Sequence, residues 1–206
     1  MKPLEIEARS FEIIAAELGD RKLDPEYDPV IRRVIHATAD FDYADALAFS
    51  EHAVARLTDA IARGCDIVTD TTMALAGVNK VALARFGGTA HCFIADADVA
   101  AEARARGVTR SWVSMEKAAR LNRPLVFAVG NAPTALLSIC DLIRRGALTP
   151  EMVIGAPVGF VNVVEAKEEL MRTAERYIVA RGRKGGSGVA AAIVNAALYQ
   201  LVSRED

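Results

Sequence analysis

Apolar positions follow two alternating patterns along the chain. Short runs rich in β-branched and aromatic residues, such as CDIVTD (65–70) and PLVFAVG (124–130), are typical of buried strands. The segments between them space their apolar residues three or four positions apart, as helices do. Strands are therefore predicted over 65–70, 90–96, 124–130, 151–155 and 177–181, and helices over 4–18, 45–63, 133–145, 160–174 and 188–202.

This alternation predicts an α/β protein with a mainly parallel sheet between two layers of helices, a three-layer α/β/α arrangement. The chain has 206 residues and 52% hydrophobic composition, which suits one substantial core. No internal repeat or low-complexity linker divides it. We expect a single domain over residues 1–206.

Composition and charge argue against several functional classes. The net charge is −2 and neither end carries a basic run, so a nucleic-acid partner is not expected. No apolar run approaches the roughly 20 residues of a membrane helix, and the first ten residues lack the apolar core of a signal peptide. The three cysteines lie far apart, which favours a reduced, cytoplasmic protein.

The segments that follow the predicted strands are the place to look for a site, because ligands of open parallel sheets bind beyond the carboxyl ends of the strands. Three of four such segments carry Gly or Pro beside a helix start, where free backbone N–H groups favour anions. Ordinary loop punctuation explains any one of them. Together they favour a bound ligand; the segments are 71–73, 131–134, 156–160 and 182–188.

Arginine makes up 19 of the 25 basic residues, and its planar group suits carboxylates and phosphates, although a proteome rich in arginine produces the same bias. Neither GxxxxGK[ST] nor GxGxxG occurs, so a nucleotide in a known loop is disfavoured. HExxH, HxH and CxxC are missing too, and we predict no metal site.

His36 is the candidate acid or base among the three histidines. It closes an amphipathic stretch, DPVIRRVIHATAD (28–40), that also contains Arg33. An imidazole titrates near pH 6.5, so it can give and take a proton in the cell, and a well-placed one contributes about 10²–10⁴ in rate. A capping or surface role is the alternative. His52 and His91 are expected to be structural.

Six segments in one order over nearly the whole chain resemble the precorrin-8X methylmutase family, including its cobalt-precorrin-8 counterparts. GNAPTAL, PVGFV and GRKGGS at their separations form the most specific combination. The segments are RSFEII (9–14), VIHATAD (34–40), GNAPTALL (130–137), VIGAPVGFVN (153–162), EAKEEL (165–170) and GRKGGSGVAAAIVNA (182–196).

The resemblance implies an isomerase that moves a methyl group from C11 to C12 of precorrin-8X to give hydrogenobyrinate. It also implies a flavodoxin-like fold, no cofactor, and a homodimer with active sites near the subunit interface. The family's catalytic histidine falls on His36, its substrate-contacting serine on Ser10 and an upstream arginine on Arg33. Ala166, where the family often has Ser, and the segment 70–80 depart from its pattern and put fine substrate contacts in doubt.

The chemistry of a methyl migration agrees with these residues. The reaction changes neither oxidation state nor atom count, so it needs no hydride carrier, metal or phosphate donor. Protonation of a ring nitrogen makes the receiving carbon electron-poor, and His36 can supply and recover that proton. The substrate's many carboxylates need donors over a wide cleft; the candidates are Arg9, Arg33, Arg110, Arg183, Lys184, Asn131, Thr134, Ser187 and loop N–H groups.

Each of these interpretations has an alternative. Every arginine could be a solvated surface charge. Phe160 could cover the flat ring of the substrate or pack beneath the next helix. The whole protein could be a corrinoid carrier without chemistry, an enzyme that holds a phosphorylated metabolite in GRKGGS, or the isomerase for the cobalt-containing substrate.

Overall fold

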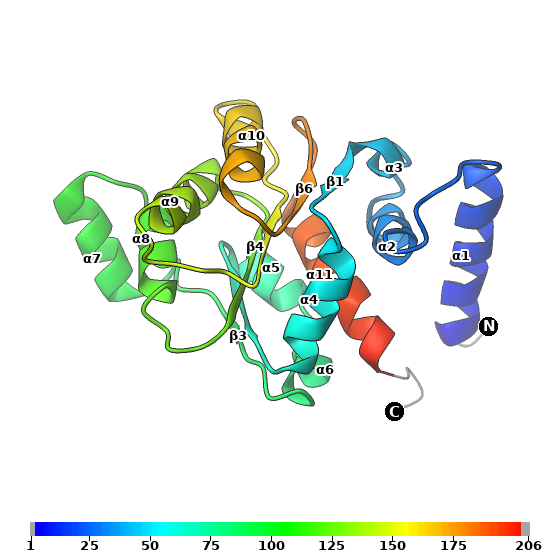
Figure 1. Ribbon diagram of the computed structural model, residues 1–206, viewed down its shortest axis with the longest axis horizontal. Coiled ribbons are helices and arrows are strands. Elements are labelled where there is room, and N and C mark those ends of the chain that lie inside the picture. Colours follow the sequence, from blue (N-terminus) through cyan, green and yellow to red (C-terminus); the bar gives the residue numbers. More distant parts are fainter. Residues whose placement is uncertain (1–2, 203–206) are drawn as a thin grey trace.

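The computed structural model describes residues 3–202 and contains a six-stranded sheet between helices (Figure 1). The strands are β1 (Leu47–Phe49), β2 (Asp66–Thr69), β3 (Ala90–His91), β4 (Leu125–Val129), β5 (Met152–Gly155) and β6 (Tyr177–Ala180). The helices are α1 (Pro3–Leu18), α2 (Asp28–Thr38), α3 (Tyr43–Ala46), α4 (Ala53–Ala62), α5 (Thr72–Gly77), α6 (Lys80–Ala84), α7 (Ala97–Arg106), α8 (Arg110–Ala118), α9 (Pro133–Arg144), α10 (Val163–Thr173) and α11 (Ser187–Leu201).

The strand order is β1-β6-β5-β4-β2-β3, in which β1 is antiparallel to β6 and the other pairs are parallel. Counted among themselves, the five parallel strands run 2-1-3-4-5, the flavodoxin-like order. This confirms the predicted fold. In such a sheet the connections leave in opposite directions on either side of β2 and β4, and the carboxyl ends of these two strands are where proteins with this topology bind ligands.

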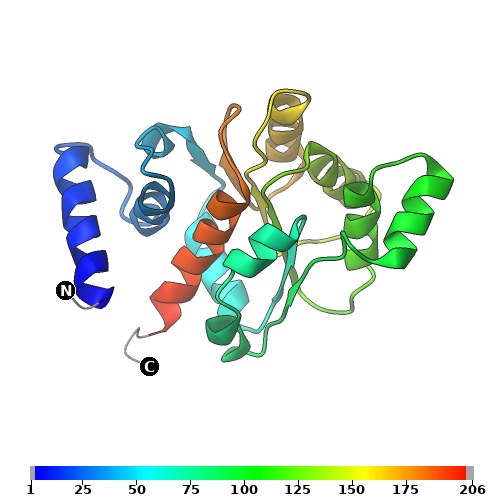
Figure 2. The same ribbon diagram turned by 180° about the vertical axis from the view of Figure 1, so that it is seen from behind.

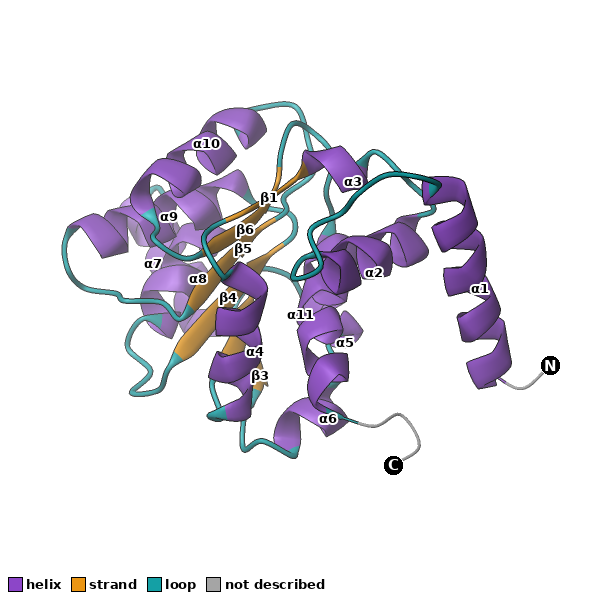
Figure 3. Ribbon diagram, turned by 45° about the vertical axis from the view of Figure 1, so that its right-hand side comes forward, coloured by secondary structure: helices purple, strands orange, loops and turns teal. Residues whose placement is uncertain are grey.

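Alternate residues of each strand face two separate apolar layers, because side chains in a strand point to opposite faces. Ile67, Val126 and Ile154 contribute to the layer with α2, α4 and α11. Val68, Phe127 and Val153 contribute to the layer with α8, α9 and α10. The two sets of helices flank the sheet in Figure 3, and Figure 2 shows α11 lying across its face. Each fully buried side chain of this size contributes about 1.5–3 kcal/mol.

The structure corrects two of the predicted elements. The helix predicted over 45–63 is three elements, because Leu47–Phe49 pair with Ile178–Ala180 as β1 and the helix α4 begins only at Ala53. His52 precedes it in the left-handed conformation, with φ at 53°. The strand predicted over 90–96 is limited to residues 90–91, where the parallel pairing with β2 ends.

Candidate active site

The helix α2 presents His36 on one side and its apolar stripe on the other. Pro29 stands in its first turn, and Ala39 ends it in the left-handed conformation. Val30 and Val34, at helical spacing on the opposite side, are fully buried against the core that includes α11. This packing fixes the helix and leaves His36 exposed on the face toward α1.

His36 lines a shallow pocket of about 230 Å³ between α1 and α2, together with Ser10. Its ring centre lies 5.1 Å from that of Phe11, and its Nδ1 lies 3.4 Å from Nη1 of Arg33. Partial burial and the positive charge of Arg33 lower the pKa of His36 below 6.5. The imidazole is therefore mostly neutral at pH 7 in the free protein, and it can accept a proton.

Arg33 is held by three neighbours. Its Nη1 donates to Oε1 of Glu7 at 2.6 Å, and its guanidinium lies over the rings of Phe11 and Tyr199 at 4.7 and 5.2 Å. These contacts join α1, α2 and α11, so Arg33 braces the helices around His36. The positive charge of Arg33 lowers the pKa of His36, so the contacts that hold Arg33 also influence the candidate acid.

The remaining predicted residues of α1 divide in role. Ser10 Oγ donates to the carbonyl oxygen of Ile6 at 2.9 Å while it lines the His36 pocket. Arg9 forms an exposed ion pair with Glu12. The structure thus brings Ser10 and His36 together, whereas Arg9 points to solvent.

A second group of predicted residues meets at the carboxyl edge of the sheet. The guanidinium of Arg183 lies 5.5 Å from the ring centre of Phe160, which is 82% exposed. The alternative that Phe160 packs beneath a helix is therefore wrong. Phe160 and Val161, also exposed, present apolar surface beside a cationic group.

Lys184 connects this edge to the segment after α2. Its Nζ donates to Asp40 Oδ2 at 2.7 Å and to Asp42 Oδ2 at 2.6 Å. The ammonium lowers the pKa of the Asp40 carboxyl. Because Asp40 follows His36 by four positions, Lys184 ties the loop 181–186 to the end of the helix that carries His36.

Ser187 is the first residue of α11. It is 91% buried, since its relative exposure is 9%, and its Oγ lies 2.8 Å from Oγ1 of Thr71. A Cβ on Gly130 would lie 2.6 Å from the Cα of Ser187, so the loops after β4 and β6 pass in direct contact. In the free protein Ser187 joins loops, and its hydroxyl is turned to Thr71.

Asp70 is a buried residue at the carboxyl edge that the sequence patterns did not single out. It is 1% exposed, and it accepts the backbone N–H groups of Gly130, Asn131 and Ala132 at 2.7–2.8 Å. Burial raises the pKa of Asp70, and these three hydrogen bonds act against that rise. The free N–H groups expected here for anions are thus occupied by a carboxylate of the protein itself. The sequence feature that points to Asp70 is its place at the end of CDIVTD (65–70), where a charged residue follows an apolar run.

Asn131 and Thr134 follow β4 at the carboxyl edge, and Arg110 lies next to Thr109, which contacts Thr134. The side chain of Asn131 is exposed, and Thr134 Oγ1 accepts from Thr109 Oγ1 at 2.9 Å. Thr109 immediately precedes Arg110, which begins α8 at the same edge and is exposed. These residues border the carboxyl edge, whereas the residues that line the His36 pocket come from α1, α2 and the segment after α2.

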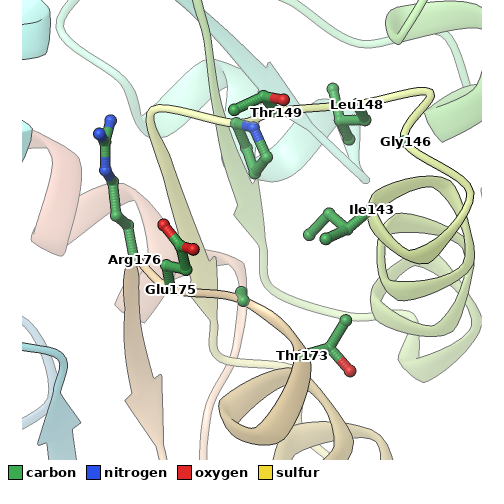
Figure 4. A pocket seen from close by; sticks show the side chains of 9 residues that line it. Ile143, Gly146, Leu148, Thr149, Thr173, Glu175 and Arg176 are labelled. Carbon is green, nitrogen blue, oxygen red and sulfur yellow. The ribbon is translucent and has the colours of Figure 1, made fainter.

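Another pocket, of about 220 Å³, lies at the opposite edge of the sheet (Figure 4). It is formed where α9 and α10 end, and Arg176 there pairs with Glu151. None of the predicted site residues lines it.

Two features of the described residues bear on other functional classes. Within residues 3–202, no group of three or more His, Cys, Asp or Glu side chains is arranged to hold a metal ion. In the same part of the chain, no helix has the length and apolar character needed to cross a membrane.

Fold and site together place the protein among the doubly wound α/β enzymes, which hold ligands at the carboxyl edge of the sheet. Within that class the chain belongs to the precorrin-8X methylmutase family, whose model matches residues 5–200.

Individual relatives agree with this membership. A cobalt-precorrin-8 methylmutase of Salmonella typhimurium is 46% identical over 206 residues, covering 97% of this chain and 96% of its own. A precorrin-8X methylmutase of Pseudomonas aeruginosa is 38% identical and covers 91% of each chain. The crystal structure of a precorrin-8X methylmutase from Thermus thermophilus superposes with a TM-score of 0.85 at 40% identity, covering 94% of this chain and 95% of that one. The predicted family and enzyme class, an isomerase, are confirmed.

Proposed function

We propose that this protein moves a methyl group from C11 to C12 of a precorrin-8X macrocycle to give the hydrogenobyrinate skeleton, with His36 as the proton-transferring residue. The observation that carries the proposal is the pocket that His36 shares with Ser10, beside Arg33, in a chain of this family. The neutral imidazole takes up a proton as carboxylates of the substrate approach, because negative charge favours the protonated form. It then protonates a ring nitrogen and recovers the proton after the methyl group has moved.

Substrate binding is assigned to the carboxyl edge. Arg183 and Lys184 supply positive charge for substrate carboxylates, and the exposed ring of Phe160 offers a flat apolar surface to the macrocycle. Arg110, Asn131 and Thr134 extend this surface along the carboxyl edge, while Arg9 lies near the His36 pocket on α1. Lys184 exchanges its aspartate partners for a substrate carboxylate when the ring binds.

The reaction is proposed to need no cofactor, since methyl migration within one molecule leaves the oxidation state unchanged. Whether the ring contains cobalt is a property of the substrate. The relatives at 46%, 42% and 41% identity are all named cobalt-precorrin-8 methylmutases, so the cobalt form is the first alternative substrate to test.

We further propose a cytoplasmic homodimer in which each chain acts as one domain over 1–206. Three free cysteines fit a reducing compartment. Ile6 and Ile13 on α1 are 50% and 46% exposed, and they offer apolar surface to a second copy beside the His36 pocket. Sedimentation velocity of the purified protein tests the dimer.

The function is tested by mixing the purified protein with metal-free precorrin-8X, and separately with its cobalt form, and following the absorption spectrum. Wild-type protein is expected to convert one of them to the rearranged product. His36→Ala is expected to bind the ring but to lose at least about 10²-fold in kcat, the contribution of a positioned acid. His52→Ala removes an exposed histidine paired with Glu26 and serves as the matched control.

Three results would change the assignment. Full activity of His36→Ala would remove the proton-transfer role. Binding of both rings by the wild-type protein without a spectral change would favour a carrier. Competition by inorganic phosphate at low concentration would favour a phosphorylated metabolite as ligand.

A further inference from the structure

Lys167 occupies a position in α10 that the helix pattern reserves for an apolar side chain. It lies on the buried stripe with Val163, Ala166 and Leu170, and it is itself only 1% exposed. Burial lowers the pKa of Lys167 to about 8, so its ammonium is still charged at neutral pH. Removing an ammonium from water is unfavourable, whereas an apolar side chain of similar volume would fill this position without that cost.

The ammonium holds the backbone of one short segment. Nζ of Lys167 donates to the carbonyl oxygens of Gly182 and Lys184, both at 2.8 Å. The carbonyl oxygen between them, that of Arg183, accepts the N–H of Gly159 at 3.1 Å. Three consecutive backbone carbonyl groups, those of residues 182–184, are thereby held by hydrogen bonds within the protein, and two of these bonds come from Lys167.

This segment carries the cationic side chains of the carboxyl edge. Arg183 extends over the exposed ring of Phe160, and Lys184 extends to Asp40 and Asp42. Both side chains are exposed, so neither fixes the loop by burial. The buried contacts beneath the loop come from Lys167 and from the N–H of Gly186, which donates to Ala156 at 2.8 Å.

We propose that Lys167 is a positioning residue for the substrate: it holds residues 182–184 in the conformation that directs Arg183 and Lys184 toward the carboxylates of the ring. The inference rests on the proposed function, because it names how that same surface is organised. A loop that is fixed before binding loses less conformational entropy when the ligand arrives, and the ligand therefore binds more tightly. Lys167 does not touch the substrate.

The test compares Lys167→Met with Lys117→Met. Both substitutions remove a lysine ammonium from a helix, but Lys117 pairs with Asp96 and Asp98 on α7 and the segment before it, away from the loop. Lys167→Met is expected to speed hydrogen exchange at the amides of Gly159 and Gly186 and to raise KM about tenfold with kcat within about twofold. Lys117→Met is expected to leave the amide exchange and KM unchanged.

A merely structural role would lower the amount of folded protein, and with it the apparent kcat, but would leave KM unchanged. That pattern, or unchanged exchange at both amides, would overturn the proposal. If Lys167→Met fails to fold, Lys167→Gln, which keeps an N–H donor, takes its place with the same expected direction. If the wild-type protein converts neither ring, the proposed function fails, and the dissociation constant of the bound ring replaces KM in the comparison.

Discussion

At the scale of single residues, the proposed chemistry depends on how neighbours set the charge of His36. Burial disfavours its protonated form, and Arg33 at 3.4 Å adds repulsion, so both causes lower its pKa. In the proposed mechanism, a substrate that brings several carboxylates to Arg33 and His36 reverses the second effect. The imidazole would then be neutral before binding and protonated more readily afterwards.

This difference predicts two separate pH limits. His36 must be protonated to act as a donor, so activity falls as the pH rises through its pKa. kcat/KM reports the free protein, so it should decline as the pH rises through the pKa of His36 in the free protein, which lies below 6.5. kcat reports the complex and should decline at higher pH. Both parameters measured between about pH 5 and 9 test this. Coincident alkaline limits would contradict the role given to substrate carboxylates.

At the scale of elements, the loop after β6 packs in close contact with the loop after β5. Gly185 lies against the residues after β5, where an added Cβ would collide with the carbonyl oxygen of Ala156 and lie 2.8 Å from that of Pro157. Gly188, three residues later in the first turn of α11, has no neighbour within 4 Å of an added Cβ. Two glycines of one motif therefore have different physical roles.

We expect Gly185→Ala to lower the free energy of unfolding by about 1–3 kcal/mol, the usual cost of overpacking, and to raise KM by displacing the loop. Gly188→Ala is the matched control and should raise stability by about 0.5–1 kcal/mol, because alanine is the better helix former. Chemical denaturation and steady-state kinetics measure both effects. Equal stability of the two variants would show that the loop moves aside freely.

At the scale of the whole molecule, buried ionisable groups make stability depend on pH. The pKa of Lys167 falls from 10.5 in the unfolded chain to about 8 in the folded protein. Between these values the unfolded chain binds more protons than the folded one, so the free energy of unfolding contributed by Lys167 rises with pH. Cys65 acts in the opposite sense, since burial raises the pKa of its thiol from 9.0 to about 12.

The stability difference between wild type and Lys167→Met isolates the lysine, because Cys65 is common to both proteins. The free energy of unfolding of the wild type, relative to that of the variant, should rise by about 3 kcal/mol between about pH 8 and 10.5. Below pH 8 the difference between the two proteins should be constant. Urea denaturation over this range measures it. A difference independent of pH would mean that Lys167 titrates normally in the folded protein.

Much of this architecture is local and was predictable. The period of apolar residues determined β2, β4, β5 and β6 and the helices α1, α9 and α11 to within a few residues, because each buries its own stripe or face. The three-layer class followed from their alternation. The exposed Phe160 lies in the loop after β5 and Arg183 in the loop after β6, two segments that the strand pattern marked. The resemblance supplied His36 and Ser10, which the structure places in one pocket.

Only the tertiary structure decided the contacts between distant residues. The pairing with β6 turned residues 47–49 from a predicted helix into a strand. The carboxylate of Asp70 accepts hydrogen bonds from the backbone N–H groups after β4. Lys167 is buried and donates to the carbonyl oxygen of Gly182, 15 residues away in the sequence. Chain periodicity records which face of an element is buried, but it does not record which polar group lies opposite, and that depends on the strand order and on the crossing of loops at one edge.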